Sequence, residues 1–130
     1  MLRLRRVDVE RRQEVFERLK VYVERVVEAL QPDVVMLFGS FAADDVNEGS
    51  DVDLVVVASF KESFLDRVKI LLEMNRESLP LEPVGYTADE FVEMAEKGNR
   101  FVWEVVEKGK TLYATVYGEA LLEQVRKLIR

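Results

Sequence analysis

The sequence contains no cysteine and no histidine among its 130 residues. The chain therefore has no disulfide, no thiolate nucleophile, no imidazole acid or base, and no zinc site of the usual Cys/His kind. Any metal ion must be bound by oxygen atoms, which is the preference of Mg²⁺, Mn²⁺ and Ca²⁺. Long apolar runs are also missing, since none approaches the roughly 20 residues that cross a bilayer, and the charged N-terminus lacks a signal-peptide core. We therefore expect a cytoplasmic protein without membrane contacts.

The chain has fewer basic residues than acidic ones. Lysine and arginine together number 19 against 25 acidic residues, which gives a formal net charge of −6. Binding to DNA requires a basic face that neutralises phosphates, so this balance predicts no DNA partner. The hydrophobic share of 48% is ordinary for a folded protein, and the length suits a single domain.

Hydrophobic periodicity predicts an alternation of helices and strands. Asp8 is the expected N-cap of the first helix, and a capping box runs from Thr87 to Glu90. Pro83 cannot donate to a sheet ladder, so its strand is expected at a sheet edge. The expected helices cover residues 8–31, 61–78, 87–98, 100–108 and 118–130, and the expected strands 34–38, 52–58, 79–86 and 111–114.

This order of elements predicts an α/β fold, a small mixed β-sheet flanked by helices. We expect one domain over residues 1–130, with a core at about 8–97 and a C-terminal helical extension at about 99–130. The sequence shows no repeat, linker or low-complexity segment that would mark a second domain.

The residues between the first two strands carry the chemistry. Gly39 and Ser40 directly follow an apolar strand, where exposed amides and a hydroxyl can bind phosphate oxygens. Asp51 and Asp53 begin the next strand, and because a strand has a period of two, both carboxylates point the same way with Cα atoms about 6–7 Å apart. Two such carboxylates repel each other unless a cation lies between them. A phosphate-binding turn beside a carboxylate pair is what metal-assisted phosphoryl or nucleotidyl transfer requires.

The spacing also resembles a known family. Gly39-Ser40, ten intervening residues and then Asp51-Val52-Asp53 are similar to the Gly-Ser-x10-Asp-x-Asp signature of the DNA polymerase β-like nucleotidyltransferase superfamily. The flanking apolar strands fit the same pattern. The chain resembles most the minimal nucleotidyltransferase branch, small prokaryotic proteins that act as antitoxins of HEPN toxins. The resemblance implies the polymerase β-like nucleotidyltransferase fold.

The resemblance further implies an activity and roles for particular residues. Asp51 and Asp53 would bind two Mg²⁺ ions that bridge the phosphates of ATP, and Gly39 and Ser40 would hold the triphosphate. Glu82, on the expected third strand, would be the third metal-binding carboxylate and would help to take the proton of the acceptor hydroxyl. The expected reaction transfers AMP to a hydroxyl group and releases pyrophosphate. In similar antitoxins the acceptor is a tyrosine of the cognate HEPN toxin.

One departure from the family pattern leaves other functions open. Family members often carry arginines in a Gly-Ser-Arg-Ala-Arg-Gly run, whereas this sequence has Phe41, Ala43 and Asp44 at the corresponding positions. ATP binding would then depend on a distant base, for which Lys61 or Arg100 is the candidate. One alternative is a weakly catalytic binding module that neutralises the toxin by forming a complex. Another is a nucleotidyltransferase for small molecules of the aminoglycoside type, in which a homodimer supplies the missing wall of the site.

Overall fold

The computed structural model describes residues 2–39, 42 and 51–129, and it describes side chains from residue 12 onward in these ranges. Helices and strands follow one another much as the periodicity predicts, which confirms the α/β class. The helices are α1 (Leu2–Leu30), α2 (Phe64–Glu73), α3 (Ala88–Glu96), α4 (Arg100–Lys108) and α5 (Val116–Leu128). The strands are β1 (Val34–Phe38), β2 (Val52–Val57), β3 (Leu81–Tyr86) and β4 (Lys110–Ala114).

The four strands form one mixed sheet in the order β3-β2-β1-β4. β1 is antiparallel to both of its neighbours, β2 and β4, whereas β2 and β3 run parallel. β3 lies at an edge of this sheet, as Pro83 predicts, because a proline nitrogen has no hydrogen to donate to a further strand. The structure therefore confirms a small mixed sheet flanked by helices.

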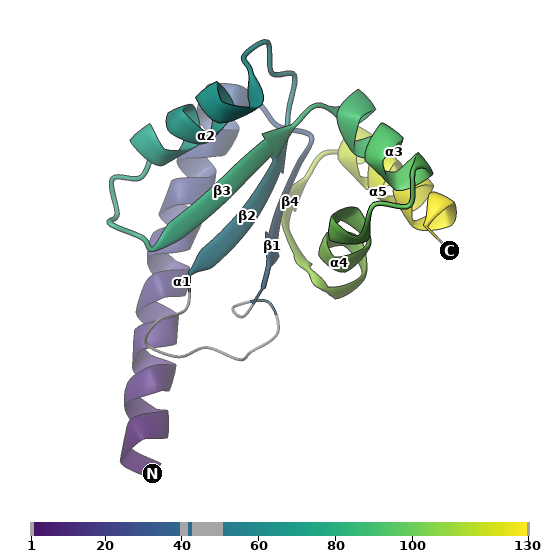
Figure 1. The fold of residues 1–130 in the computed structure, drawn as a ribbon. Coiled ribbons are helices and arrows are strands. Elements are labelled where there is room, and N and C mark those ends of the chain that lie inside the picture. The colour runs from purple at the N-terminus through teal and green to yellow at the C-terminus, as the bar shows by residue number, and fades with distance from the viewer. Residues whose placement is uncertain (1, 40–41, 43–50, 130) are drawn as a thin grey trace.

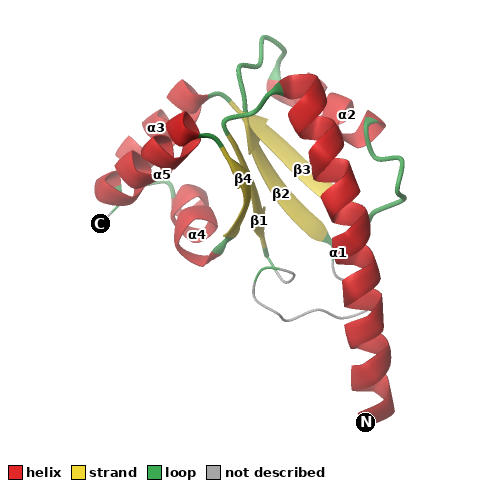
Figure 2. Cartoon of the chain, turned by 180° about the vertical axis from the view of Figure 1, so that it is seen from behind, coloured by secondary structure: helices red, strands yellow, loops and turns green. Residues whose placement is uncertain are grey.

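Helices cover both faces of the sheet (Figures 1 and 2). α1 and α2 lie on one face, and α3, α4 and α5 lie on the other. The side chains of β1 alternate between two apolar cores, so that Val35 and Leu37 join the core under α1 while Val34 and Met36 join the core under α3–α5. Burial on both faces is the reason why β1 is apolar at every position.

Two helices differ from the prediction. α1 begins at Leu2, so Asp8 lies inside this helix and the prediction that it forms the N-cap is wrong. α2 is shorter than expected because Ser63 caps its start. Beyond its end, the side chain of Asn75 donates to the carbonyl oxygen of Leu79 (2.8 Å) and accepts from the amide of Leu79 (3.1 Å). These bonds form a turn in place of further helical turns, and they delay the start of β3.

Although α1 is 29 residues long, neither it nor any other helix in the described part of the chain has the length and apolar character that crossing a membrane requires.

Candidate functional site

Three neighbouring strand ends bring the predicted site residues together. In the sheet register, Phe38 of β1 lies opposite Asp53 of β2, and Asp53 lies beside Glu82 of β3. Gly39 directly follows Phe38. Segments that are far apart in the sequence therefore place Gly39, Asp53 and Glu82 at one end of the sheet.

The carboxylates also share a face of the sheet. Val55 of β2 and Val84 of β3 pack in the core under α3–α5. Because side chains alternate along a strand, Asp53 and Glu82 point to that same face. Asp53 is half-buried, whereas Glu82 and Asp51, which directly precedes β2, are exposed. The face thus presents one sheltered carboxyl group and two that solvent or a ligand can reach.

Asp53 is in an unfavourable place for a negative charge. Its pKa is raised from 3.8 to about 6, first by burial, then by the side-chain hydrogen bond with Glu82, and then by the negative charges of Glu82 and Asp51. The hydrogen bond means that the side chains of Asp53 and Glu82 are in direct contact. A cation bound here would favour the ionised forms and offset the repulsion.

The absence of a side chain at Gly39 leaves room for the carboxylate of Asp53. A Cβ atom at position 39 would overlap Oδ2 of Asp53 and lie 3.1 Å from its Cγ. The backbone of Gly39 also has φ = 75°, a left-handed conformation that glycine adopts without steric cost. Glycine is therefore required at this position both by the turn and by the neighbouring carboxylate.

The donor set fits a divalent metal ion in its chemistry, since it consists of oxygen atoms only and carries excess negative charge. Asp53 and Glu82 are in contact, and Asp51 is close enough for its charge to raise the pKa of Asp53. Across residues 12–39, 42 and 51–129, however, no three acidic side chains come close enough together to form a metal site. The structure thus brings two of the three predicted ligands, Asp53 and Glu82, into contact, and Asp51 acts on Asp53 only through its charge.

The predicted phosphate-binding turn is described only in part. Ser40 lies outside the described residues, as do Phe41 and Ala43, at the positions where family members often carry arginine, and Asp44 beside them. The role of Ser40 in triphosphate binding stays a prediction.

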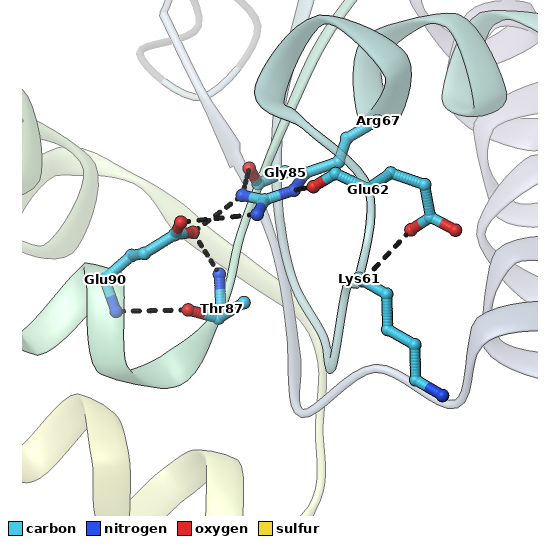
Figure 3. Close-up of polar contacts among 6 residues, drawn as sticks. All are labelled: Lys61, Glu62, Arg67, Gly85, Thr87 and Glu90. Atoms are coloured by element: carbon cyan, nitrogen blue, oxygen red, sulfur yellow. Dashed lines mark hydrogen bonds and ion pairs between the residues drawn. The ribbon is translucent and has the colours of Figure 1, made fainter.

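Lys61 does not lie near the carboxylates. β2 runs away from the site, so its far end is about 13 Å from Asp53 at 3.3 Å per residue. Lys61 follows that far end, on the connection to α2 (Figure 3). The expectation that Lys61 compensates for the missing arginines is therefore wrong. Arg100, the other candidate, starts α4, where it pairs with Glu104 (3.5 Å) and stacks on the ring of Trp103 (5.6 Å).

A pair of ionic contacts that the sequence analysis missed holds the two ends of β3, the strand that carries Glu82. Before β3, the guanidinium group of Arg25 in α1 binds both carboxylate oxygens of Glu77 (2.6 and 2.7 Å) and donates to the carbonyl oxygen of Met74 (2.9 Å). This contact lowers the pKa of Glu77 and raises that of Arg25. It ties the connection between α2 and β3 to the long helix.

At the other end of β3, the buried Arg67 of α2 makes contacts to three segments (Figure 3). Its guanidinium group donates to the carbonyl oxygens of Glu62 (2.8 Å) and Gly85 (3.2 Å) and to Oε1 of Glu90 (2.6 Å). The hydrogen bond from Arg67 lowers the pKa of Glu90. Glu90 in turn accepts from the amide of Thr87 (2.8 Å), which confirms the capping box that the sequence predicts.

Neither contact carries a local sequence signal. The partners Arg25 and Glu77 are 52 residues apart, and Arg67 and Glu90 are 23 residues apart. A charged residue on a helix is usually a solvated surface residue, so the sequence offers no reason to single out these four.

Acidic side chains thus lie at one end of a mixed sheet, beside a glycine turn. The family model "Polymerase beta, Nucleotidyltransferase" matches residues 20–116, a range that includes Gly39, Asp51, Asp53 and Glu82. The chain therefore belongs to the polymerase β nucleotidyltransferase family, as the Gly-Ser and Asp-x-Asp spacing predicts.

Solved structures share the fold at low sequence identity. A candidate nucleotidyltransferase from Sulfolobus solfataricus has 19% identity and a TM-score of 0.60, with 82% of this chain and 86% of that chain covered. A toxin-antitoxin structure with AMP-PNP has 17% identity and a TM-score of 0.55, covering 84% and 85%. A mutant form of the toxin-antitoxin MntA-HpeT has 17% identity and a TM-score of 0.54, covering 82% and 81%. No curated protein matches the sequence.

Proposed function

We propose that this protein is a Mg²⁺-dependent nucleotidyltransferase that transfers AMP from ATP to a hydroxyl group, the acceptor being a tyrosine of a cognate HEPN-type toxin. It would then be the antitoxin of a toxin–antitoxin pair. The observation that carries the proposal is the contact between Asp53 and Glu82, beside Gly39, in a chain of the polymerase β nucleotidyltransferase family.

In this proposal Asp51, Asp53 and Glu82 hold two Mg²⁺ ions, and Gly39 and Ser40 hold the triphosphate. The ions supply charge neutralisation and Lewis-acid activation at the phosphates when bound. The raised pKa of Asp53 supports this assignment, because a half-buried carboxyl group beside two others is ionised far more easily when a cation shares the site.

The reaction forms a bond between the acceptor oxygen and the α-phosphorus of ATP. The bond from that phosphorus to the oxygen bridging the α- and β-phosphates breaks, and pyrophosphate leaves with the electron pair. We assign the proton of the acceptor hydroxyl to the carboxylate of Glu82, because this group is exposed and can be reached by an incoming side chain, whereas Asp53 is half-buried.

The choice of a protein acceptor rests on two further observations. Two of the similar structures are toxin–antitoxin assemblies, and one of them was solved with AMP-PNP. The matched regions cover more than four fifths of this chain and of each of those chains. Asp51 and Glu82 are exposed, so a partner protein can present its own hydroxyl group to them.

The test is a transfer assay with a candidate toxin, chosen as a small helical protein with an Arg-x4-His motif where the reading frame next to that of this chain encodes one. After incubation with Mg·ATP, intact-mass spectrometry should find about 329 Da added to the partner for each AMP transferred. Asp51→Asn with Asp53→Asn should abolish the mass shift. The matched control, Asp66→Asn with Asp89→Asn, removes the same charge from the exposed first turns of α2 and α3 and should leave the transfer unchanged.

The same assay separates the alternative binding module. This alternative rests on the missing arginines after Gly39-Ser40, and Lys61, one candidate to replace them, lies beyond the far end of β2. If Asp51→Asn with Asp53→Asn neutralises the toxin as well as the wild type, and no nucleotide produces a mass shift, neutralisation occurs by complex formation and the transferase proposal fails.

A further inference from the structure

An apolar groove of about 500 Å³ lies between α1 and the edge strand β4, on the face of the sheet opposite the carboxylates. Phe16, Val23 and Val27 of α1 line one side, and Leu112 and Tyr113 of β4 line the other. All of these except the buried Val23 are half-buried. Figure 2 shows α1 and α2 on this face, with no described helix over β4.

The groove has the shape of a helix-docking seam. Its α1 side follows positions 16, 20, 23 and 27, which have the alternating spacing of four and three residues found in coiled coils. Val27 lies eleven positions after Phe16, so the strip is about 16.5 Å long at 1.5 Å per residue. A strip of this length along one helix matches the face of another helix better than a compact ligand.

Three charged residues line the groove, Lys20, Glu24 and Glu28, and the first two are self-complementary. Lys20 and Glu24 are exposed, line the same groove and lie one helical turn apart. When two such helices meet about a two-fold axis, each contact occurs twice with the roles exchanged. An antiparallel pair that crosses at residue 22 sets the lysine of each copy against the glutamate of the other.

We infer that this groove is a homodimer interface in which α1 packs antiparallel against α1 of a second copy. In that arrangement Phe16 contacts Val27 of the partner subunit, and Lys20 lies beside Glu24 of the partner subunit. Leu112 and Tyr113 complete the apolar contact from β4. The helix of the partner subunit thus covers the part of this sheet face that α1 and α2 leave open.

The arrangement pairs residues 14–30 of the two α1 helices, because Lys20 facing Glu24 sets residue 14 against residue 30. The N-terminal part of α1, which extends beyond the sheet (Figure 1), lies outside this contact. Because the groove and the Asp53–Glu82 pair are on opposite faces, dimerisation leaves the proposed active site open.

The test is the molar mass of the purified full chain by sedimentation equilibrium. The wild type should have twice the 15.1 kDa of one chain. Lys20→Glu and Glu24→Lys should each weaken dimerisation by about tenfold or more, because each single reversal replaces two attractive pairs with two like-charge contacts. The double variant Lys20→Glu with Glu24→Lys restores both pairs and should dimerise within about threefold of the wild type.

A matched control reverses an exposed charge outside the groove. Lys69→Glu on α2 should leave the dimer unchanged, and circular dichroism should find all four variants as folded as the wild type. The inference is overturned if the wild type is a monomer up to about 200 µM. It is also overturned if the single reversals dimerise as the wild type does, or if the double variant is no better than the single ones. The measurement requires neither nucleotide nor toxin, so its failure is independent of the proposed function.

Discussion

The ionised form of Asp53 lowers the stability of the metal-free protein, whereas the proposed metal site requires that form. The group is half-buried, contacts Glu82 and is near Asp51, and its pKa is raised to about 6. It therefore favours the folded state while protonated, and this contribution is lost as the pH rises from about 4 to 6, where the folded protein gives up its proton. At neutral pH the ionised group opposes folding in the metal-free protein.

Asp53→Asn should therefore stabilise the metal-free protein at neutral pH. The asparagine carries no charge and can still donate a hydrogen bond to Glu82, and the gain should be on the order of 1 kcal/mol or less after solvent screening is considered. Urea unfolding in EDTA should find a larger difference between variant and wild type at pH 7.5 than at pH 4.5. A difference that grows toward low pH would contradict this explanation.

Gly39→Ala should damage the site more than the backbone conformation alone explains. The new methyl group would overlap Oδ2 of Asp53, and alanine at φ = 75° costs about 1–2 kcal/mol in addition. Gly98→Ala is the matched control, because Gly98 has φ = 72° and a Cβ atom there meets nothing within 4 Å. Urea unfolding should find Gly39→Ala the less stable variant, and Mg·ATP-dependent transfer should fall only for Gly39→Ala. Equal losses in both variants would contradict the steric argument.

At the scale of elements, β3 depends on side chains from three helices. Arg25 of α1 holds the segment before it, and Arg67 of α2 connects its end to Glu90 of α3. Among the described strands β3 pairs with β2 alone, so these contacts add to a single ladder of backbone bonds. They fix the strand on which Glu82 lies beside Asp53.

Arg67→Ala should lower the free energy of unfolding by about 2–3 kcal/mol, because it removes the ionic contact of a buried arginine and the hydrogen bond that this arginine donates to the carbonyl oxygen of Gly85. The comparison is Lys97→Ala, which breaks the exposed pair of Lys97 with Glu93 (2.7 Å) and should cost no more than about 0.5 kcal/mol. Urea unfolding measures both. Similar costs for the two variants would mean that the burial of Arg67 adds nothing.

The elements that the sequence predicts well are those that local pattern determines. An uninterrupted apolar run identifies β1 because both of its faces are buried, and the capping box locates the start of α3. The end of α2 and the start of β3 are set instead by the turn around Asn75 and by the Arg25–Glu77 contact. Such contacts depend on the tertiary fold, which helix periodicity does not encode.

At the scale of the whole molecule, the sheet separates two surfaces with different chemistry. One face carries Asp53 and Glu82 at its end, and the other carries the apolar groove beside α1. The motif spacing predicts the first surface, because Gly39 follows β1 and Asp53 lies in β2, the two strands that flank the signature. Glu82 is brought to the same place by the parallel pairing of β3 with β2. The spacing does not predict the second surface, because the groove depends on how far α1 and α2 extend over the sheet. The prediction for Lys61 failed for a similar reason. The direction of β2 in the sheet places Lys61 at the end opposite the carboxylates.

The most direct measurement for the account is the titration of the protein with AMP-PNP, with Mg²⁺ or EDTA present, by isothermal calorimetry. The wild type should bind only with Mg²⁺, and Asp53→Asn with Glu82→Gln should weaken that binding at least about tenfold. Asp66→Asn with Glu123→Gln, the same charge change on exposed helix positions, should bind as the wild type does. Equal affinity of the Asp53/Glu82 variant and the wild type, or binding that is unaffected by EDTA, would contradict a carboxylate-based nucleotide site at this end of the sheet.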